Sequence, residues 1–353
     1  MNIWAVCKDP GGTNGVLPVV KALQAMGHNV LVIVNGKAVE LLKDKEEYVV
    51  YDDAARLLAD YPLPEAVITS MCSKGGVGRD LVPLLKGRVP VVALQDFWGG
   101  ALWAEWAEVR PDYITTNDEV GKKIIQDAWP DFSPDHIKVT GFPALDKYKT
   151  VDVRAVTERV RVTLGLSENK PIILVGGQAD FSGPMLKEVV SCLNTIGQDV
   201  YLIPRAHPRM KNDWPQEQLG WENAMREFNS GTLLADTSVC DTPSLIACSS
   251  FVISMFSTIQ IEAAVLRKPN ISVWYPEIER IWYQSTNEKM GDFPLVRLGC
   301  AAKAENREVL CELLRQALNG DLDLRVKQEQ NFRLDGKNAE RVAQFISTLT
   351  RSL

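Results

Sequence analysis

A turn between a short apolar run and a helix-like segment carries the first residues that could do chemistry. Residues 251–253 are Phe, Val and Ile, and residues 254–269 continue with hydroxyl side chains, a helix-period segment and a Lys-Pro ending. This order predicts a strand, a turn and a helix. Ser257 and Thr258 would stand at the helix start, where free N–H groups and the helix dipole favour an anion. We expect the turn to hold a nucleotide phosphate and Glu262 to bind the ribose; a ligand-free turn with a solvated Glu262 is the alternative.

A second group of polar residues follows the predicted strand 200–203. Arg205, His207 and Arg209 fall within one short loop, which Pro208 would hold extended. Arginine forks match phosphate oxygens, and histidine can donate a hydrogen bond to phosphate. The loop is therefore expected to contact phosphate, with a solvated cationic loop as the alternative. The three His and the scattered Cys lack the spacing of a metal cluster, so no metal site is expected.

Two aspartates in the first half could act as a general base. Asp9 belongs to the Gly-rich segment 8–15, after the predicted strand 1–7, and Asp96 follows the predicted strand 89–94. Either carboxylate would lie at the carboxyl edge of a sheet and could remove a proton from an acceptor hydroxyl. The sequence does not choose between the two. The segment 8–15 lacks the GxGxxG pattern, so a dinucleotide site is weakly supported.

The neighbours of these aspartates indicate where an acceptor would bind. Gly12, Thr13 and Asn14 belong to a predicted loop that either contacts the acceptor or turns tightly and caps the next helix. Trp98 stands two residues after Asp96, and aromatic side chains beside a carboxylate suit a sugar face. A packing role, or an exposed surface for a partner, is the alternative for the tryptophans.

Apolar runs alternate with helix-period segments along the chain, which predicts an α/β fold with parallel sheets. The predicted strands of the first half are 1–7, 29–34, 48–51, 66–69, 89–94, 113–116 and 137–140. Those of the second half are 171–175, 200–203, 232–235, 251–254, 270–274 and 295–298, while 275–290 shows no clear period.

Gly and Pro at 141–143 mark a change of direction, so a domain boundary is expected at 146–152. We predict a Rossmann-like N-terminal domain, residues 1–148, on the acceptor side. A second Rossmann-like domain, residues 149–335, would hold the nucleotide donor. Residues 336–353 are expected to form a C-terminal helix that packs back on the first domain.

Composition limits the class of protein. With 353 residues, of which 46% are hydrophobic and 24% charged, the chain is typical of a two-domain globular protein. A net charge of −6 disfavours general nucleic-acid binding, which needs a basic surface. The seven Cys form no CxxC pair and mostly adjoin apolar residues, which predicts reduced core thiols of a cytoplasmic protein. No signal-peptide pattern or bilayer-length apolar run is present, so a cytoplasmic location is expected, with peripheral contact at the inner membrane left open.

Several motifs, taken in order, resemble those of GT-B glycosyltransferases. They are the Gly-rich segment 11–15, Thr-Gly-Phe-Pro at 140–143, Arg-x-His-Pro at 205–208, Ser-x-x-Ser-Thr-x-x-x-Glu-Ala-x-x-x-x-Lys-Pro at 254–269 and Asp-Gly-Lys-Asn-Ala-Glu-Arg-Val at 335–342. The set is similar to a group that spans UDP-N-acetylglucosamine 2-epimerases, CDP-glycerol glycerophosphotransferases and bacterial capsule transferases, including those that use CMP-sugars. The Gly-Thr-Arg-Pro-Glu loop of the epimerases is absent, which argues against an epimerase.

The resemblance implies two Rossmann-like domains whose parallel sheets face a cleft, with no metal cofactor. The donor contacts that it implies come from His207, Ser257, Thr258 and Glu262, and from a phosphate edge lined by Gly176 and Gly177. The resulting hypothesis is a metal-independent glycosyltransferase that moves a sugar or polyol phosphate from a UDP-, CDP- or CMP-activated donor to a glycan or lipid-linked acceptor of the cell envelope. The alternatives are a nucleotide-sugar 2-epimerase or hydrolase, and a non-catalytic binding protein with the same fold.

Overall fold

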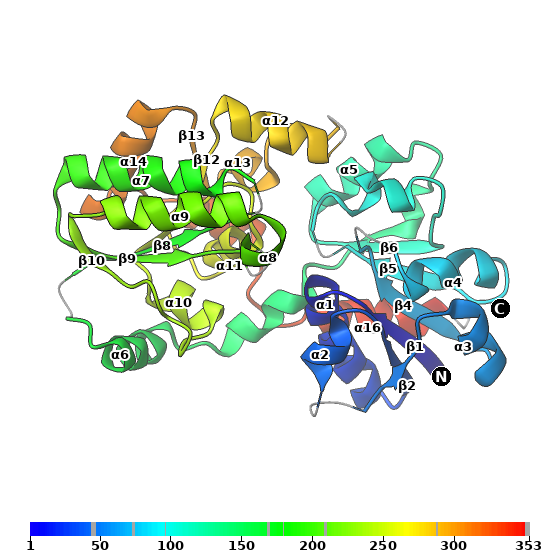
Figure 1. Cartoon of the computed structure of the whole chain (residues 1–353). Helices are drawn as coiled ribbons and strands as arrows, with labels where there is room; N and C mark the ends of the chain where they lie inside the picture. The colour runs from blue at the N-terminus through cyan, green and yellow to red at the C-terminus, as the bar shows by residue number, and fades with distance from the viewer. Residues whose placement is uncertain are drawn as a thin grey trace. The chain divides into compact units, whose positions relative to one another are not determined.

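The computed structural model describes residues 1–43, 47–72, 75–95, 97–167, 170–178, 180–207, 210–286 and 289–349. The chain divides into two compact units: Met1–Lys149 together with Leu334–Leu353, and Thr150–Arg333. Each unit has a parallel sheet with helices on both faces (Figure 1). The predicted two-domain α/β fold with parallel sheets is therefore confirmed.

In the first unit, seven strands of the described residues form one sheet in the order β3-β2-β1-β4-β5-β6-β7. The strands are β1 (Asn2–Cys7), β2 (Asn29–Val34), β3 (Val49–Val50), β4 (Ala66–Ser70), β5 (Val91–Leu94), β6 (Tyr113–Thr116) and β7 (Ile137–Val139). The helices are α1 (Pro10–Ala25), α2 (Ala38–Leu42), α3 (Ala54–Asp60), α4 (Val77–Leu85), α5 (Glu119–Ala128) and α16 (Asn338–Leu349). Short 3-10 helices span Gly100–Leu102, Ala104–Trp106, Pro134–His136 and Pro143–Thr150.

The alternation of side chains along β1 separates the two cores of this unit. Trp4 and Val6 belong to the apolar cluster under α3 and α4, whereas Ile3 and Ala5 belong to the cluster under α1 and α16. The C-terminal helix α16 packs along α1. Its start is held by Asp146, whose carboxylate accepts hydrogen bonds from the backbone N–H groups of Asn338 at 3.1 Å and Ala339 at 2.8 Å.

The Gly-rich segment 11–15 is not a loop, as the sequence predicted, but the first turns of α1. Glycine is a poor helix former, and here close packing requires it. A Cβ at Gly12 would lie 1.9 Å from the Ser70 hydroxyl, and one at Gly15 would lie 2.8 Å from a methyl group of Leu94. The glycines therefore let α1 lie against the ends of β4 and β5.

In the second unit, six strands of the described residues form a sheet in the order β10-β9-β8-β11-β12-β13. The strands are β8 (Ile172–Gly176), β9 (Val200–Arg205), β10 (Gly231–Leu233), β11 (Phe251–Ser254), β12 (Asn270–Val273) and β13 (Ala302–Ala304). The longer helices are α6 (Val153–Leu164), α7 (Ser182–Ile196), α9 (Pro215–Glu227), α12 (Pro276–Ser285) and α14 (Arg307–Asn319). The shorter ones are α8 (Met210–Asp213), α10 (Thr242–Cys248), α11 (Thr258–Val265), α13 (Pro294–Arg297) and α15 (Arg325–Asn331). Figure 1 shows α7 and α9 on one face of this sheet and α6 and α10 on the other.

One prediction for the end of this unit was wrong. The apolar run 295–298 is not a strand; Leu295 lies in α13, and the last strand is β13, seven residues later than expected at its start. A short apolar run does not distinguish a strand from a helix, and Pro294 at the first position of α13 favours the helix. The stretch 275–290, without a clear period, contains the helix α12, which also begins with a proline, Pro276.

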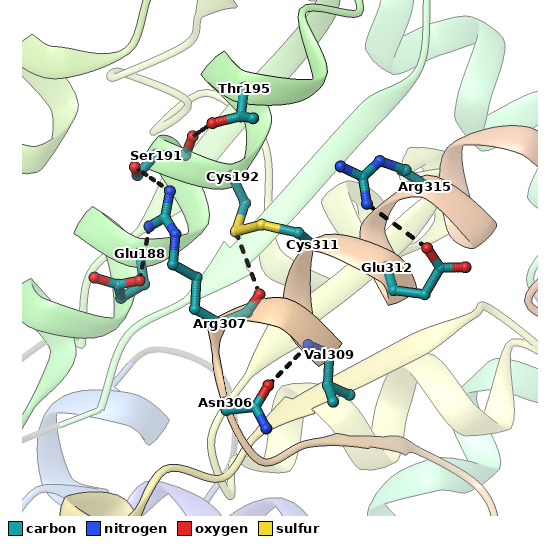
Figure 2. Close-up of a disulfide and its surroundings, with 10 residues drawn as sticks. All are labelled: Glu188, Ser191, Cys192, Thr195, Asn306, Arg307, Val309, Cys311, Glu312 and Arg315. Carbon is teal, nitrogen blue, oxygen red and sulfur yellow. Dashed lines mark hydrogen bonds and ion pairs between the residues drawn. A yellow bond between two sulfur atoms is a disulfide. The ribbon is translucent and has the colours of Figure 1, made fainter.

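The prediction that all seven cysteines are reduced was also wrong. Cys192 of α7 and Cys311 of α14 form a disulfide across 119 residues of sequence (Figure 2). The packing of α14 on α7 brings the two together, and no sequence spacing marks such a pair. The other five cysteines are buried free thiols. The cysteines therefore no longer argue for a reducing compartment. Among the described residues, no helix is both long enough and apolar enough to cross a bilayer.

Candidate functional site

The strands β9, β8 and β11 are neighbours in the second sheet, and the predicted donor residues follow their ends. Gly176 pairs with Arg205 in the register of β8 and β9, and the Gly177 N–H donates to the Arg205 carbonyl oxygen at 2.8 Å. On the other side of β8, the Ser254 hydroxyl donates to the Gly176 carbonyl oxygen at 2.7 Å. The segments 176–178, 205–207 and 254–258 therefore meet at the carboxyl edge of one sheet.

The helix α11 starts where the sequence predicts. Ser257 is its N-cap: the Ser257 hydroxyl accepts from the Ile259 N–H at 3.5 Å, and Gln260 Oε1 accepts from the Ser257 N–H at 3.2 Å. This reciprocal capping fixes the first turn of the helix. Ser257 is half-buried and Thr258 exposed, so the turn is open to solvent. Glu262 is half-buried in the second turn of the same helix.

The glycines at the end of β8 bring the neighbouring segments into direct contact. A Cβ at Gly176 would lie 2.9 Å from Ile259 Cγ2, at the start of α11, and one at Gly177 would lie 3.1 Å from Met210 Cε. Gln178 Nε2 donates to the Phe256 carbonyl oxygen at 3.3 Å, across the same edge. The turn before α11 is thus held against the end of β8 from two sides.

The predicted cationic loop begins at the end of β9. Arg205 is the last residue of that strand and is half-buried, as is His207. The His207 ring meets the Trp214 ring edge-on, with 5.7 Å between ring centroids, and the His207 carbonyl oxygen accepts from the Met210 N–H at 2.9 Å. Arg209 lies outside the described residues. The edge thus carries one guanidinium and one imidazole, the groups that bind anions most readily.

A pocket of about 350 Å³ adjoins this loop, and sequence reasoning missed it. Its lining residues come from the end of β9, from α9 and from the segment after β10: Pro204, Arg205, Ala206, Gln218, Trp221, Met225, Ala235, Asp236, Thr237 and Ser238. Asp236 is exposed, and its carboxylate accepts from the Ser238 N–H at 3.0 Å. Hydrogen bonds from Ser238 hold the pKa of Asp236 below its ordinary value. Arg205 thus belongs both to this pocket and to the sheet edge formed by residues 176–178, 205–207 and 254–258. Asp236 adds an ionised carboxylate to the pocket.

In the first unit, Asp9 is the N-cap of α1. Its Oδ1 accepts from the Gly12 N–H at 2.9 Å, and the Thr13 hydroxyl donates to the Asp9 carbonyl oxygen at 2.6 Å. Gly12 and Thr13 are buried, whereas Asn14 is exposed. These residues therefore have the helix-capping role that the sequence left as an alternative to acceptor binding. Of the three predicted acceptor residues in this segment, Asn14 is the one a ligand can reach.

The structure favours the packing alternative for Trp98. Its ring is fully buried, and its indole N–H donates to both carboxylate oxygens of Asp118, at 3.1 and 2.9 Å. A fully buried ring has no face to offer a sugar, so Trp98 is not an acceptor contact. Burial raises the pKa of Asp118, although hydrogen bonds from Gly121 and Trp98 act in the opposite direction. Asp96, the other candidate base, lies outside the described residues.

Within the described ranges, no group of three or more His, Cys, Asp and Glu side chains is arranged to hold a metal ion.

A family model matches residues 104–348 of this chain, and the family is described as CDP-glycerol:poly(glycerophosphate) glycerophosphotransferase. The chain belongs to this glycerophosphotransferase family. It is thus a member of a family of transferases whose description names a nucleotide-activated polyol phosphate as the donor. The match covers the second unit and only part of the first, as do the motifs that carried the resemblance in the sequence. The curated proteins that were compared include no match.

Solved structures show that this glycerophosphotransferase family member has the GT-B fold. UDP-GlcNAc 2-epimerase from Neisseria meningitidis, bound to UDP-GlcNAc, matches 99% of this chain and 100% of its own, with a TM-score of 0.71 and 14% identity. The wall teichoic acid polymerase TagF, in a structure with CDPG, matches 100% of this chain and 89% of its own, with a TM-score of 0.61 and 14% identity. MurG from Acinetobacter baumannii matches 99% of both chains, with a TM-score of 0.60 and 15% identity. At such identities the likeness establishes the fold alone.

Proposed function

We propose that this protein is a metal-independent transferase that moves a polyol phosphate, or a sugar, from a nucleotide-activated donor to a hydroxyl group of a cell-envelope acceptor. Membership of the glycerophosphotransferase family supports a CDP-linked polyol phosphate as the donor. The observation that carries the proposal is the meeting of Arg205, His207 and the α11 start at the ends of three neighbouring strands. Ligands of parallel α/β sheets bind at this edge.

The proposed donor site neutralises the two phosphates of the donor with protein groups. Arg205 and His207 would donate hydrogen bonds to the phosphate oxygens, and the Ser257 hydroxyl and the Thr258 backbone N–H would contact them at the positive end of the α11 dipole. Glu262 would accept from the ribose hydroxyls. Gly176 and Gly177 would lie beside the phosphates, although the space next to their Cα atoms is occupied by the side chains of Ile259 and Met210.

The proposed reaction is an in-line displacement at phosphorus. The acceptor oxygen forms a bond to the distal phosphorus of the donor while the bond between that phosphorus and the bridging oxygen breaks. The nucleoside monophosphate leaves with the bonding electrons, and the acceptor proton passes to a general base, for which Asp9 and Asp96 remain the candidates. Charge on the leaving phosphate would be stabilised by the Arg205 and His207 groups and by the α11 start.

We further propose that the pocket beside Arg205 takes the base of the nucleotide. The Asp236 carboxylate could accept a hydrogen bond from the exocyclic amino group of cytosine, whereas uracil presents a carbonyl oxygen there. This difference would select CDP over UDP.

Titration calorimetry with CDP, UDP, CMP and GDP tests the donor proposal. We expect CDP to bind the wild-type protein more tightly than UDP, and Asp236→Asn to reduce that preference by about tenfold. Thr232→Asn, a change at an exposed residue outside the pocket, serves as the control. Equal affinity for all four nucleotides, or none for any, would contradict the proposal. In an assay with CDP-glycerol, product that forms only when an acceptor is present supports transfer, and turnover without acceptor would support a hydrolase or epimerase instead.

A further inference from the structure

Two polar residues at the carboxyl ends of β1 and β2 lie side by side in the first unit. Lys8 follows β1 and Asn35 follows β2, and the parallel register of these strands ends at the pair Cys7 and Val34. The Asn35 N–H donates to the Cys7 carbonyl oxygen at 3.0 Å, which continues the ladder by one step. Side chains alternate along strands, so Lys8 is on the same face of the sheet as Val6, and Asn35 is on the same face as Ile33. That face is the one covered by α4.

The Asn35 side chain is 4% exposed, and within the described residues neither its amide nitrogen nor its amide oxygen is paired. A buried, unpaired amide destabilises the folded state. An apolar residue of similar size would avoid this cost, so the amide is expected to serve a group that comes from outside the chain.

The start of α4 lies next to Lys8. Its N-cap is Gly76, with φ of 119°, which has no side chain to accept from the first N–H groups of the helix. Lys8 Nζ donates to the Gly75 carbonyl oxygen at 2.8 Å. A Cβ at Gly76 would lie 2.7 Å from Lys8 Cδ and 3.2 Å from Lys8 Nζ, so glycine leaves the space that the lysine occupies. The ammonium group therefore lies beside the uncapped helix start.

The neighbouring cation, Arg79, already has partners of its own. Arg79, in the first turn of α4, donates from Nε to the Glu105 carbonyl oxygen at 2.6 Å and pairs with Asp80 at 3.2 Å. Lys8, the α4 start and Asn35 thus combine a cation, free backbone N–H groups and an amide within one edge of the sheet. These are the groups that bind a phosphate oxygen.

We infer that this corner is a subsite for a phosphodiester group of the acceptor. This inference rests on the proposed function and narrows its acceptor to a polyol-phosphate chain. Lys8 and the N–H groups at the start of α4 bind the phosphate oxygens, and the Asn35 amide donates a further hydrogen bond. A chain that carries one phosphate per unit would be held here while its terminal hydroxyl reacts elsewhere on the molecule. An uncharged glycan would gain little from the same groups.

Binding of sn-glycerol 3-phosphate to the full chain, with glycerol as the uncharged control, tests the subsite by calorimetry. We expect the phosphate ester to bind and glycerol not to bind. Lys8→Gln should weaken binding of the ester by about tenfold, as loss of one charge-assisted hydrogen bond implies. Lys86→Gln is the matched control, because Lys86 lies at the opposite end of α4 and is exposed. Its binding should equal that of the wild-type protein.

Asn35→Leu provides a second and independent measurement. Removal of an unpaired amide should leave the urea midpoint unchanged or raise it, while binding of glycerol 3-phosphate falls severalfold. A fall in the urea midpoint with unchanged binding would show a structural role and overturn the inference. Binding that depends on His207 and not on Lys8 would also overturn it, because the ester would then occupy the donor site.

Titration of the same variants with CDP separates the two proposals. CDP that binds wild type and Lys8→Gln equally, while glycerol 3-phosphate binding depends on Lys8, supports both. If CDP binds no variant but the ester still requires Lys8, the donor proposal fails and the subsite stands. If CDP binds and Lys8 makes no difference to the ester, the subsite fails and the donor proposal stands.

Discussion

The Ser254 hydroxyl donates a hydrogen bond of 2.7 Å to the carbonyl oxygen of Gly176 and so joins the end of β11 to the end of β8. Ser254 is fully buried, and the bond crosses between neighbouring strands at the edge where the donor residues meet. It therefore positions the turn that leads into α11. Because the Ser254 hydroxyl is not exposed to solvent, its role is to hold this edge in place.

Ser254→Ala should show this positioning role. The change leaves the buried Gly176 carbonyl oxygen without that donor, so we expect a loss of about 1–2 kcal/mol in the free energy of unfolding, measured by urea denaturation. CDP affinity should fall with it, because the α11 start is no longer held against β8. Ser133→Ala, at an exposed position of the first unit, is a suitable control. If Ser254→Ala had normal stability and normal CDP affinity, Ser254 would have no positioning role.

His207→Ala tests the imidazole at the donor edge. The variant should fold normally, since His207 is only half-buried. Loss of a charge-assisted hydrogen bond predicts a rise in the dissociation constant of CDP by about tenfold to a hundredfold, measured by calorimetry. His136→Gln, a change in the first unit, should leave CDP binding unaltered. Unchanged CDP affinity in His207→Ala would exclude phosphate contact by this residue.

The sequence was sufficient for the parts of the fold that local chemistry determines. The β–α alternation predicted both sheets, and the Ser257–Thr258 pair marked the start of α11 because hydroxyl residues cap helices. The sequence was not sufficient where tertiary packing determines the secondary structure. The glycines after Asp9 suggested a loop, yet they belong to α1. Glycine is needed there because the helix packs so closely against Ser70 that a side chain would not fit. The Asp-Pro pair at 9–10 was the available signal, an N-cap followed by proline at the first helical position.

The parts of the candidate site that the sequence missed come from residues far apart in the chain. The pocket at Arg205 and Asp236 needs the end of β9, one face of α9 and the segment after β10, and no spacing rule links them. Trp98 was considered for ligand binding because it is an aromatic residue close to Asp96 in the sequence. In the structure its ring is buried and its indole N–H is bonded to Asp118. Asn35 drew no attention because an unpaired amide is recognised only once its surroundings are known.

Reduction of the disulfide should destabilise the second unit. Cys192 and Cys311 close a loop of 119 residues, and loss of such a link costs about 2–5 kcal/mol, chiefly because the unfolded chain gains freedom. We therefore expect a lower urea midpoint in the presence of a thiol reductant. Arg307 still ties α14 to α7 after reduction, with hydrogen bonds to Glu188 at 2.9 Å and Ser191 at 2.7 Å (Figure 2). The fold itself should consequently survive.

The double variant Cys192→Ser with Cys311→Ser is the control for this prediction. It should match the reduced wild-type protein and should not respond to the reductant. Cys240→Ser, which alters a cysteine outside the bond, should keep the response. Equal urea midpoints for the oxidised and reduced wild-type protein would show that the link does not contribute to stability.

Asp118→Asn should reveal the cost of a buried carboxylate at the end of β6. Burial raises the pKa of Asp118 above its unfolded value of 3.8, so the folded state binds the proton more tightly than the unfolded state does. The stability that this proton supplies is fully present below pH 3.8 and is lost as the pH rises through the raised pKa. Asparagine keeps an oxygen that can cap α5 and accept from the Trp98 indole, but it does not ionise.

The difference between the two proteins isolates this group from the other acids of the chain. We expect the urea midpoint of the wild-type protein, relative to that of Asp118→Asn, to fall between pH 4 and the raised pKa and to stay level at higher pH. Asp131→Asn changes an exposed carboxylate whose pKa is lowered by its hydrogen bond to Arg110, so its difference from wild type should have the opposite slope. A wild-type protein that gains stability relative to Asp118→Asn as the pH rises would show that hydrogen bonds from Trp98 and Gly121 outweigh burial. In that case the folded protein would prefer the ionised form of Asp118.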